Sequence, residues 1–168
     1  MGFTPTFISI LDGLHAQMLV RLVVAVALGS FVGYERERQG KPAGLRTHAM
    51  VAMGAALFTV VSLYGFGAEA DRSRLAAMIV SGIGFLGAGA ILHERGGVQG
   101  LTTAASLWVT AAIGIAVGVG MFSMSLATAA LVFVVLRFAP VVRPRASTNG
   151  IAATDEIGKV GNEQQTNN

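Results

Sequence analysis

The stretch SGIGFLGAGA, residues 81–90, holds three glycines in the spacing G-x-G-x-x-G, at positions 82, 84 and 87. This spacing binds a dinucleotide when it follows a strand and opens a helix, because the backbone can then approach a pyrophosphate closely. Here it lies inside the uncharged run Leu75–Leu92, and no acidic residue follows about 20 positions later to bind a ribose. We therefore interpret these glycines as helix-packing residues rather than a nucleotide site.

Asp71, in the segment ADRSR at residues 70–74, directly precedes that run. A carboxylate at this place can accept hydrogen bonds from the amides of the next helix, where the helix dipole also favours a negative charge. The alternative is a functional carboxylate whose charge engages Arg74, a bound cation or a basic group of a partner. The residues themselves leave both interpretations open.

The densest polar stretch before residue 143 is Gly33–His48, GYERERQGKPAGLRTH. One interpretation is a cytoplasmic loop that sets the topology, with Thr47 capping the next helix. The other is a docking or regulatory surface built on the charged residues of this loop. Its candidate functional residues are Glu35, Glu37, Lys41 and Arg46.

Few residues suggest metal or covalent chemistry. His48 and the pair His93 and Glu94 could share a metal, but two histidines without ligand spacing are weak support for such a site. Cysteine is absent, and no serine or threonine in an apolar run has a neighbouring base to activate it. We therefore predict no metal site, no cofactor and no enzymatic activity.

The composition indicates which elements must position these residues. Of 168 residues, 53% are hydrophobic and only 12% are charged, and the mean hydropathy is +0.64. Soluble domains carry about 25% charged residues. The chain therefore has the composition of a polytopic membrane protein.

Four long uncharged runs are present, and a helix crosses the roughly 30 Å hydrocarbon core in about 20 residues. The fourth run is too long for one span, so we expect a hairpin at Gly118–Ser123. The prediction is an all-α transmembrane bundle of about five spans in residues 1–142, followed by a disordered cytoplasmic tail, residues 143–168. The runs are Leu22–Tyr34, extending back to about Ala16, Ala49–Ala68, Leu75–Leu92 and Leu101–Leu136.

Small residues recur at helical spacing in three of the spans. In lipid such stripes let helix backbones approach closely. We expect tight packing through these seams and possible homo-oligomer formation. The stripes are Ala25, Gly29 and Gly33; Ala77, Ser81, Gly84 and Ala88; and Ala111, Gly114 and Gly118.

The distribution of Lys and Arg predicts the orientation, because cytoplasmic loops carry the excess of these residues. We expect the N-terminus outside and the C-terminus in the cytoplasm. The outer side holds Arg21, Arg72 and Arg74, and the cytoplasmic side holds Arg36, Arg38, Lys41, Arg46, Arg95, Arg137, Arg143 and Arg145.

The segments GYERER, KPAGLRTHAMVAMGAALF and DRSRLAAMIVSGIGFLGAGAILHERGGVQGLTTAASLWVTAAIGIAVGVG together resemble the MgtC/SapB (YhiD-type) membrane protein family. The resemblance covers roughly residues 18–140. It implies a bacterial inner-membrane protein linked to magnesium limitation and acid stress. Asp71 corresponds to the acidic residue of the family's D-x-S-R segment, which is regarded as important. Glu35, Glu37, Lys41 and Arg46 correspond to its first cytoplasmic loop.

Two features depart from the family pattern. Arg72 stands where many members have proline, and only residues 143–168 stand where longer members have a soluble C-terminal domain. The resemblance implies a non-enzymatic regulator that binds other membrane proteins, with the rotary ATP synthase as the partner by analogy and no nucleic acid. The alternative function is a small transporter or channel for Mg²⁺ or another ion.

Overall fold

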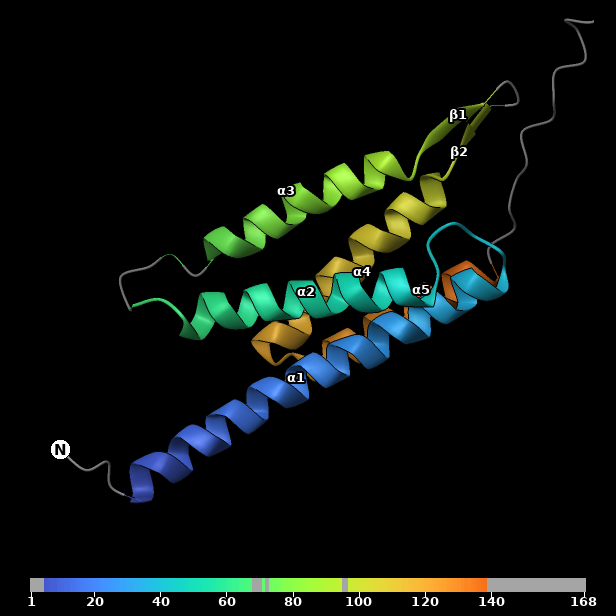
Figure 1. Cartoon of the computed structure of the whole chain (residues 1–168). Coiled ribbons are helices and arrows are strands. Elements are labelled where there is room, and N and C mark those ends of the chain that lie inside the picture. Colours follow the sequence, from blue (N-terminus) through green and yellow to red (C-terminus); the bar gives the residue numbers. More distant parts are fainter. Residues whose placement is uncertain (1–4, 68–70, 72, 95–96, 139–168) are drawn as a thin grey trace, which may run out of the picture. The chain divides into compact units, whose positions relative to one another are not determined.

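The computed structural model describes the backbone of residues 5–67, 71, 73–94 and 97–138, and the side chains of residues 13–67, 71, 73–91 and 98–138. All of the helices lie in one compact unit, and of a second unit, residues 95–97 and 140–168, only Gly97 is described. The predicted tail, residues 143–168, lies outside the described residues. The elements (Figure 1) are α1 (Pro5–Arg38), α2 (Leu45–Tyr64), α3 (Ser73–Gly89), β1 (Leu92–Glu94), β2 (Gly97–Gln99), α4 (Leu101–Val119) and α5 (Phe122–Phe138).

Five α-helices in the described part confirm the predicted all-α bundle. Three contain an apolar segment long enough to cross a membrane, namely Gly13–Arg38, α2 and α4, and the shorter α3 and α5 are also apolar. The predicted break in the long fourth run is confirmed, because α4 ends at Val119 and Gly120 adopts a left-handed conformation with φ 99°. Its amide donates to the carbonyl oxygens of Ala116 and Val117, which closes the helix.

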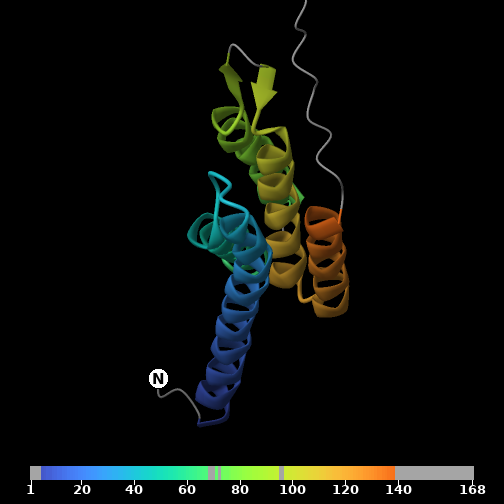
Figure 2. The same cartoon turned by 90° about the vertical axis from the view of Figure 1, so that its right-hand side faces the viewer.

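Helices α2 and α4 form the centre of the bundle. Helix α2 packs against both α1 and α4, and α4 lies between α2 and α5 (Figure 2). Helix α3 packs mainly on α4 and more loosely on α2, so it lies at the edge of the bundle. Its only buried residues in the described part are Ile83 and Gly87.

The bundle has two ends, which we name after α1 residues. At the Glu35 end, the C-terminal ends of α1 and α5 meet the N-terminal ends of α2 and α4. Gln39 Nε2 donates to Leu136 O at 2.9 Å, and Arg36 Nη2 donates to Thr103 Oγ1 at 2.6 Å. At the Arg21 end, the C-terminal ends of α2 and α4 lie beside the middle of α1 and the start of α3 (Figure 1).

Glycines of α1 and α4 allow both helices to approach α2 closely. A Cβ added to Gly29 would lie 2.6 Å from the carbonyl oxygen of His48, and one added to Gly118 would lie 2.6 Å from Thr59 Cβ. A Cβ at Gly114 would overlap the carbonyl oxygen of Ala52. Both helices therefore contact α2 through backbone, as expected for small-residue seams in lipid. Gly33 also belongs to this set.

The small-residue stripe on α3 does not pack against the bundle as the sequence predicted. Ala77, Ser81, Gly84 and Ala88 of α3 are exposed, and nothing lies within 4 Å of a Cβ added to Gly84. Helix α3 turns a different face, with Ile83 and Gly87, toward the bundle. The predicted packing of the Gly84 stripe is therefore not met within the described bundle, and it stays a prediction for contact with another chain.

The polar stretch Gly33–His48 was expected to be a loop, and most of it is helical. Helix α1 continues to Arg38 and α2 begins at Leu45. Thr47 lies inside α2 and does not cap it. Glu37 Oε2 instead accepts a hydrogen bond from the Leu45 amide at 2.8 Å, so the end of α1 caps the start of α2.

The short hairpin of β1 and β2 was not predicted. It joins α3 to α4, and its last turn requires a glycine at position 100. Gly100 has φ 89°, and a Cβ at this position would overlap the carbonyl oxygen of Ala90.

Candidate functional site

The Glu35 end contains a buried polar cluster, which we define as Glu35, Arg36, His48, Thr103 and Ser106. Arg36 is only 2% exposed, and its Nη2 donates to Thr103 Oγ1 at 2.6 Å. Arg36 Nε has no hydrogen-bond partner among the described residues. Burial of a charge with an unbonded N–H group is unfavourable. The cluster thus brings an incompletely paired cation to the start of α4.

Glu35 is also 2% exposed, and Gln39 Nε2 donates to its Oε1 at 2.8 Å. Arg137 Nε lies 3.9 Å from the same oxygen, but the Arg137 side chain is 51% exposed. An exposed partner at this distance contributes little, because solvent screens the attraction. Gln39 therefore joins Glu35 to the last turn of α5, since the same amide also donates to Leu136 O.

His48 is fully buried and both of its ring nitrogens are engaged. Nδ1 lies 2.9 Å from Gly44 O, and Nε2 lies 3.1 Å from Ser106 Oγ. Ser106 Oγ also donates to Thr103 O at 2.8 Å, which continues the network along α4. His48 thus joins α2 to α4. The side chains of His93 and Glu94, which were considered as partners in a metal site, lie outside the described residues.

Lys41 and Arg46 are exposed at the same end, beside the link between α1 and α2. Neither has an ion pair in the part of the chain that the structure describes. Glu37, in contrast, is used to cap α2. Of the four loop candidates, Glu35 and Glu37 therefore make contacts within the bundle. Lys41 and Arg46 face outward.

Asp71 and Arg74 lie at the Arg21 end, so the structure does not bring them together with the loop candidates. Asp71 Oδ1 accepts hydrogen bonds from the amide of Ser73 at 2.9 Å and from its hydroxyl at 2.7 Å. These hydrogen bonds, and less strongly the charge of Arg74, lower the pKa of the Asp71 carboxyl below its usual range. Asp71 is exposed and stabilises the start of α3, as the capping interpretation predicts.

From its position in the sequence Arg21 was expected only at the outer flank, yet it makes specific contacts. Arg21 Nη1 donates to Gly118 O at 2.7 Å, and its guanidinium lies 5.6 Å from the centre of the Tyr64 ring. A cation is favoured at this place because the C-terminal end of α4 carries the negative end of its dipole. Arg21 therefore holds α1, α2 and α4 together. An arginine inside an otherwise apolar run was the signal for this role.

Among the described residues, no three His, Asp or Glu side chains lie close enough to hold a metal ion. The charged groups of the described bundle lie at its two ends, and the buried residues of the described spans between them are small or apolar, or carry a hydroxyl as Thr59 and Thr110 do. This arrangement joins helices to one another. It also places one described hydroxyl beside a base, which the sequence did not indicate: Ser106 Oγ lies 3.1 Å from His48 Nε2, and both side chains are buried between α2 and α4.

Comparison with known proteins is consistent with this architecture. The model of the MgtC family matches residues 22–144. "Putative magnesium transporter YhiD" of Escherichia coli K12 is 44% identical over 128 residues, 72% of this chain and 60% of that protein. "Protein MgtC" of Salmonella typhimurium LT2 is 46% identical over 114 residues, 68% of this chain and 48% of that protein. An uncharacterized protein of Synechocystis is 48% identical over 118 residues.

The chain thus spans about half to three fifths of the length of these relatives. No solved structure matches it. The family model covers most of the chain, including all of α2 to α5 and α1 from Leu22 onward. On this basis the protein is a membrane protein with several apolar helices that belongs to the MgtC family.

Proposed function

We propose that this protein is a non-enzymatic regulator in the bacterial inner membrane that acts by binding another membrane protein. The observation that carries the proposal is the exposed outer face of α3. Ala77, Ser81, Gly84 and Ala88 form a continuous small-residue stripe there, with open space where a Gly84 side chain would be. In lipid, small-residue faces allow a second helix to approach closely and gain dispersion contacts.

The polar groups support a regulator over an enzyme. Polar groups at both ends are used in contacts between helices, as in the bonds of Arg36 to Thr103 and of Arg21 to Gly118. Such contacts occupy the polar groups within the bundle, whereas α3, at its edge, leaves the face with the Gly84 stripe exposed. A partner helix is therefore the ligand that the fold is best suited to bind.

The charges support an orientation with the C-terminus in the cytoplasm. The Glu35 end carries more basic residues than the Arg21 end, and such residues are retained on the cytoplasmic side. In the described part, the Glu35 end has Arg36, Arg38, Lys41, Arg46 and Arg137, and the other end has Arg21 and Arg74.

The physiological setting that we propose is magnesium limitation, because the relatives include proteins named MgtC and YhiD. The rotary ATP synthase is the partner that the family resemblance suggests. Crosslinking in native membranes followed by mass spectrometry tests this, with wild type compared to Gly84→Leu. We expect a specific membrane-protein adduct that Gly84→Leu abolishes.

The matched control is Gly82→Leu. Gly82 is on the same helix, and a Cβ there also meets open space. Two residues correspond to about 200° around a helix, so Gly82 is on the opposite side of α3 from Gly84. Loss of the adduct in both variants, or in neither, contradicts docking through the Gly84 stripe.

Ion transport is the second candidate function, favoured by the name of YhiD. Mg²⁺ is bound through oxygen ligands in octahedral geometry and gives up its water reluctantly. In the described spans such ligands would have to come from backbone carbonyls and hydroxyls. Proteoliposomes loaded with a Mg²⁺-sensitive dye distinguish the two functions. Protein-dependent Mg²⁺ entry that Gly84→Leu leaves unchanged would favour transport over regulation.

A further inference from the structure

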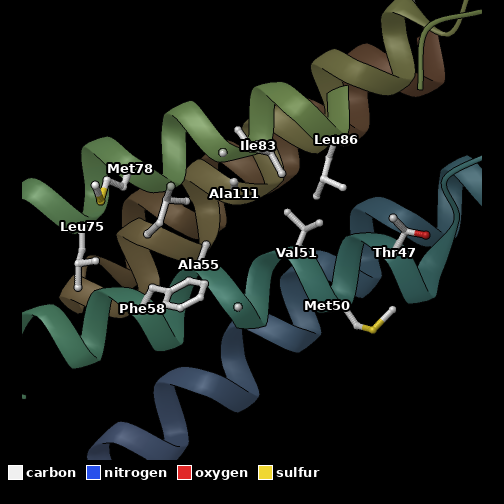
Figure 3. A pocket seen from close by; sticks show the side chains of 13 residues that line it. Thr47, Met50, Val51, Ala55, Phe58, Leu75, Met78, Ile83, Leu86 and Ala111 are labelled. Carbon is white, nitrogen blue, oxygen red and sulfur yellow. The ribbon is translucent and has the colours of Figure 1, made fainter. Parts of the chain in front are cut away.

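An apolar groove of about 600 Å³ lies between α2 and α3, with Ala111 of α4 at its floor. Figure 3 shows Val51 and Leu86 pointing toward each other across it, and Phe58 and Leu75 near one end. Thr47, at the opposite end, is the only one of the described lining residues with a polar side chain. The groove is therefore suited to a hydrocarbon ligand that has a polar group at one end.

The length of the groove matches one leaflet of a bilayer. Along α2 it extends from Thr47 to Phe58, and along α3 from Leu86 to Leu75. Each stretch corresponds to about 16 Å at 1.5 Å per residue. The hydrocarbon core is roughly 30 Å thick, so one leaflet contributes about half of that. A partner helix that crosses the membrane would instead need a groove along the full length of α2.

The groove also has room for a thin ligand. An extended acyl chain is much thinner than an α-helix, whose diameter with side chains is about 10 Å or more, and a groove of about 600 Å³ accommodates such a chain. Gly54 and Gly82 keep it open, since nothing lies within 4 Å of a Cβ added to either.

A cation lies at the polar end of the groove. Arg46 precedes the lining residue Met50 by four positions, which places it one turn closer to the Glu35 end on the same side of α2. Arg46 is exposed and has no ion pair among the described residues. It also lies in the first turn of α2, where the helix dipole favours an anion. A phosphate at this position would meet both positive groups.

We propose that this groove is a binding site for an anionic phospholipid. One acyl chain lies between α2 and α3, and the phosphate contacts Arg46 and the Thr47 hydroxyl. The site is on the opposite side of α3 from the Gly84 stripe, so a bound lipid and a partner helix do not compete for the same surface.

The test uses the full chain and one tryptophan in the groove. The chain has a single native tryptophan. The double variant Trp108→Phe, Phe58→Trp therefore has one indole, which lies at the end of the groove opposite Thr47. The protein is reconstituted in phosphatidylcholine vesicles that contain increasing amounts of a lipid with brominated acyl chains. This lipid is either brominated phosphatidylglycerol or brominated phosphatidylcholine. Quenching of the indole fluorescence reports occupancy of the groove.

We expect brominated phosphatidylglycerol to reach half-maximal quenching at about fivefold lower mole fraction than brominated phosphatidylcholine. This factor corresponds to roughly 1 kcal/mol for one basic residue at an anionic lipid. Gly82→Leu fills the groove and Arg46→Gln removes the cation, so each should abolish the preference. The matched controls are Gly84→Leu, on the other face of α3, and Arg38→Gln, at the same end on α1; both should retain it.

Three results would overturn the proposal. The first is equal quenching by the two lipids in the parent double variant. The second is a preference that survives both Gly82→Leu and Arg46→Gln. The third is protection of the indole from quenching by both brominated lipids that increases with the protein-to-lipid ratio. That result would mean that a second copy of the chain occupies the groove. If Gly82→Leu does not reconstitute, the comparison of Arg46→Gln with Arg38→Gln decides alone.

Discussion

The contact between α1 and α2 gives the sharpest test of the fold, through the substitution Gly29→Ala. The added methyl group would lie 2.6 Å from His48 O and 2.8 Å from Ala52 Cβ. Ordinary contacts between such atoms are about 3.5–4.0 Å. Because the nearest atom belongs to the backbone of α2, the two helices must separate by about 1 Å at this point. The same separation would weaken the neighbouring contacts along the seam.

The magnitude follows from two opposing effects. Overpacking of a well-packed core destabilises by about 1–3 kcal/mol. Alanine is favoured over glycine inside a helix by about 0.5–1 kcal/mol. We therefore expect Gly29→Ala to lower the free energy of unfolding by about 1 kcal/mol, within a range of about 0–2.5 kcal/mol. The control is Gly84→Ala, the same substitution in a helix with open space around the new methyl group. It should be neutral or stabilising by up to about 1 kcal/mol.

Unfolding in mixed detergent micelles with increasing sodium dodecyl sulfate, followed by circular dichroism, measures both variants against wild type. The two substitutions have the same effect on the unfolded chain, so their difference reports only the native contact. If Gly29→Ala is as stable as Gly84→Ala, α1 and α2 do not approach each other as closely as the structure has them.

Three further predictions concern the ends of the bundle. Arg21→Met removes the hydrogen bond to Gly118 O and should destabilise the bundle by about 1.5–3 kcal/mol in the same unfolding assay; an unchanged midpoint contradicts the bridging role. Because the hydrogen bonds from Ser73 lower the pKa of Asp71, its stabilisation should persist at neutral pH and disappear as the pH falls through that lowered value. Asp71→Asn should remove this pH dependence, and growth complementation at low magnesium by the same variant then shows whether the charge is needed for function; full complementation leaves Asp71 as a helix cap. Reporter fusions at Gly40 and at the C-terminus should both report the cytoplasm, and a periplasmic signal at either position refutes the orientation.

The helix content could be predicted from the sequence because it depends on local properties. A long uncharged run must satisfy its own backbone hydrogen bonds in lipid, so it forms a helix whatever its neighbours are. The break between α4 and α5 was similarly local, since Gly120 adopts the positive φ that ends a helix. The capping geometry of Asp71 also involves only the next two residues.

The role of each small-residue stripe could not be predicted in this way. Gly29 on α1 and Gly84 on α3 lie in similar patterns, yet one contacts the backbone of α2 and the other is exposed. The difference depends on how each helix is rotated about its axis, which is set by contacts with residues far away in the sequence. The same reason explains why Glu35 and Arg36, which the sequence indicated as loop charges, are buried.

The sequence by itself determined that the chain is a bundle of apolar helices, because the length and hydrophobicity of a run decide whether it can span lipid. Only the tertiary structure decided which faces are used inside the bundle. It paired Arg36 with Thr103 and Arg21 with Gly118, and it left a groove between α2 and α3. The two pairings arise because α1 packs on α4, and the groove arises because α3 packs mainly on α4 at the edge of the bundle. No local pattern of residues encodes either placement.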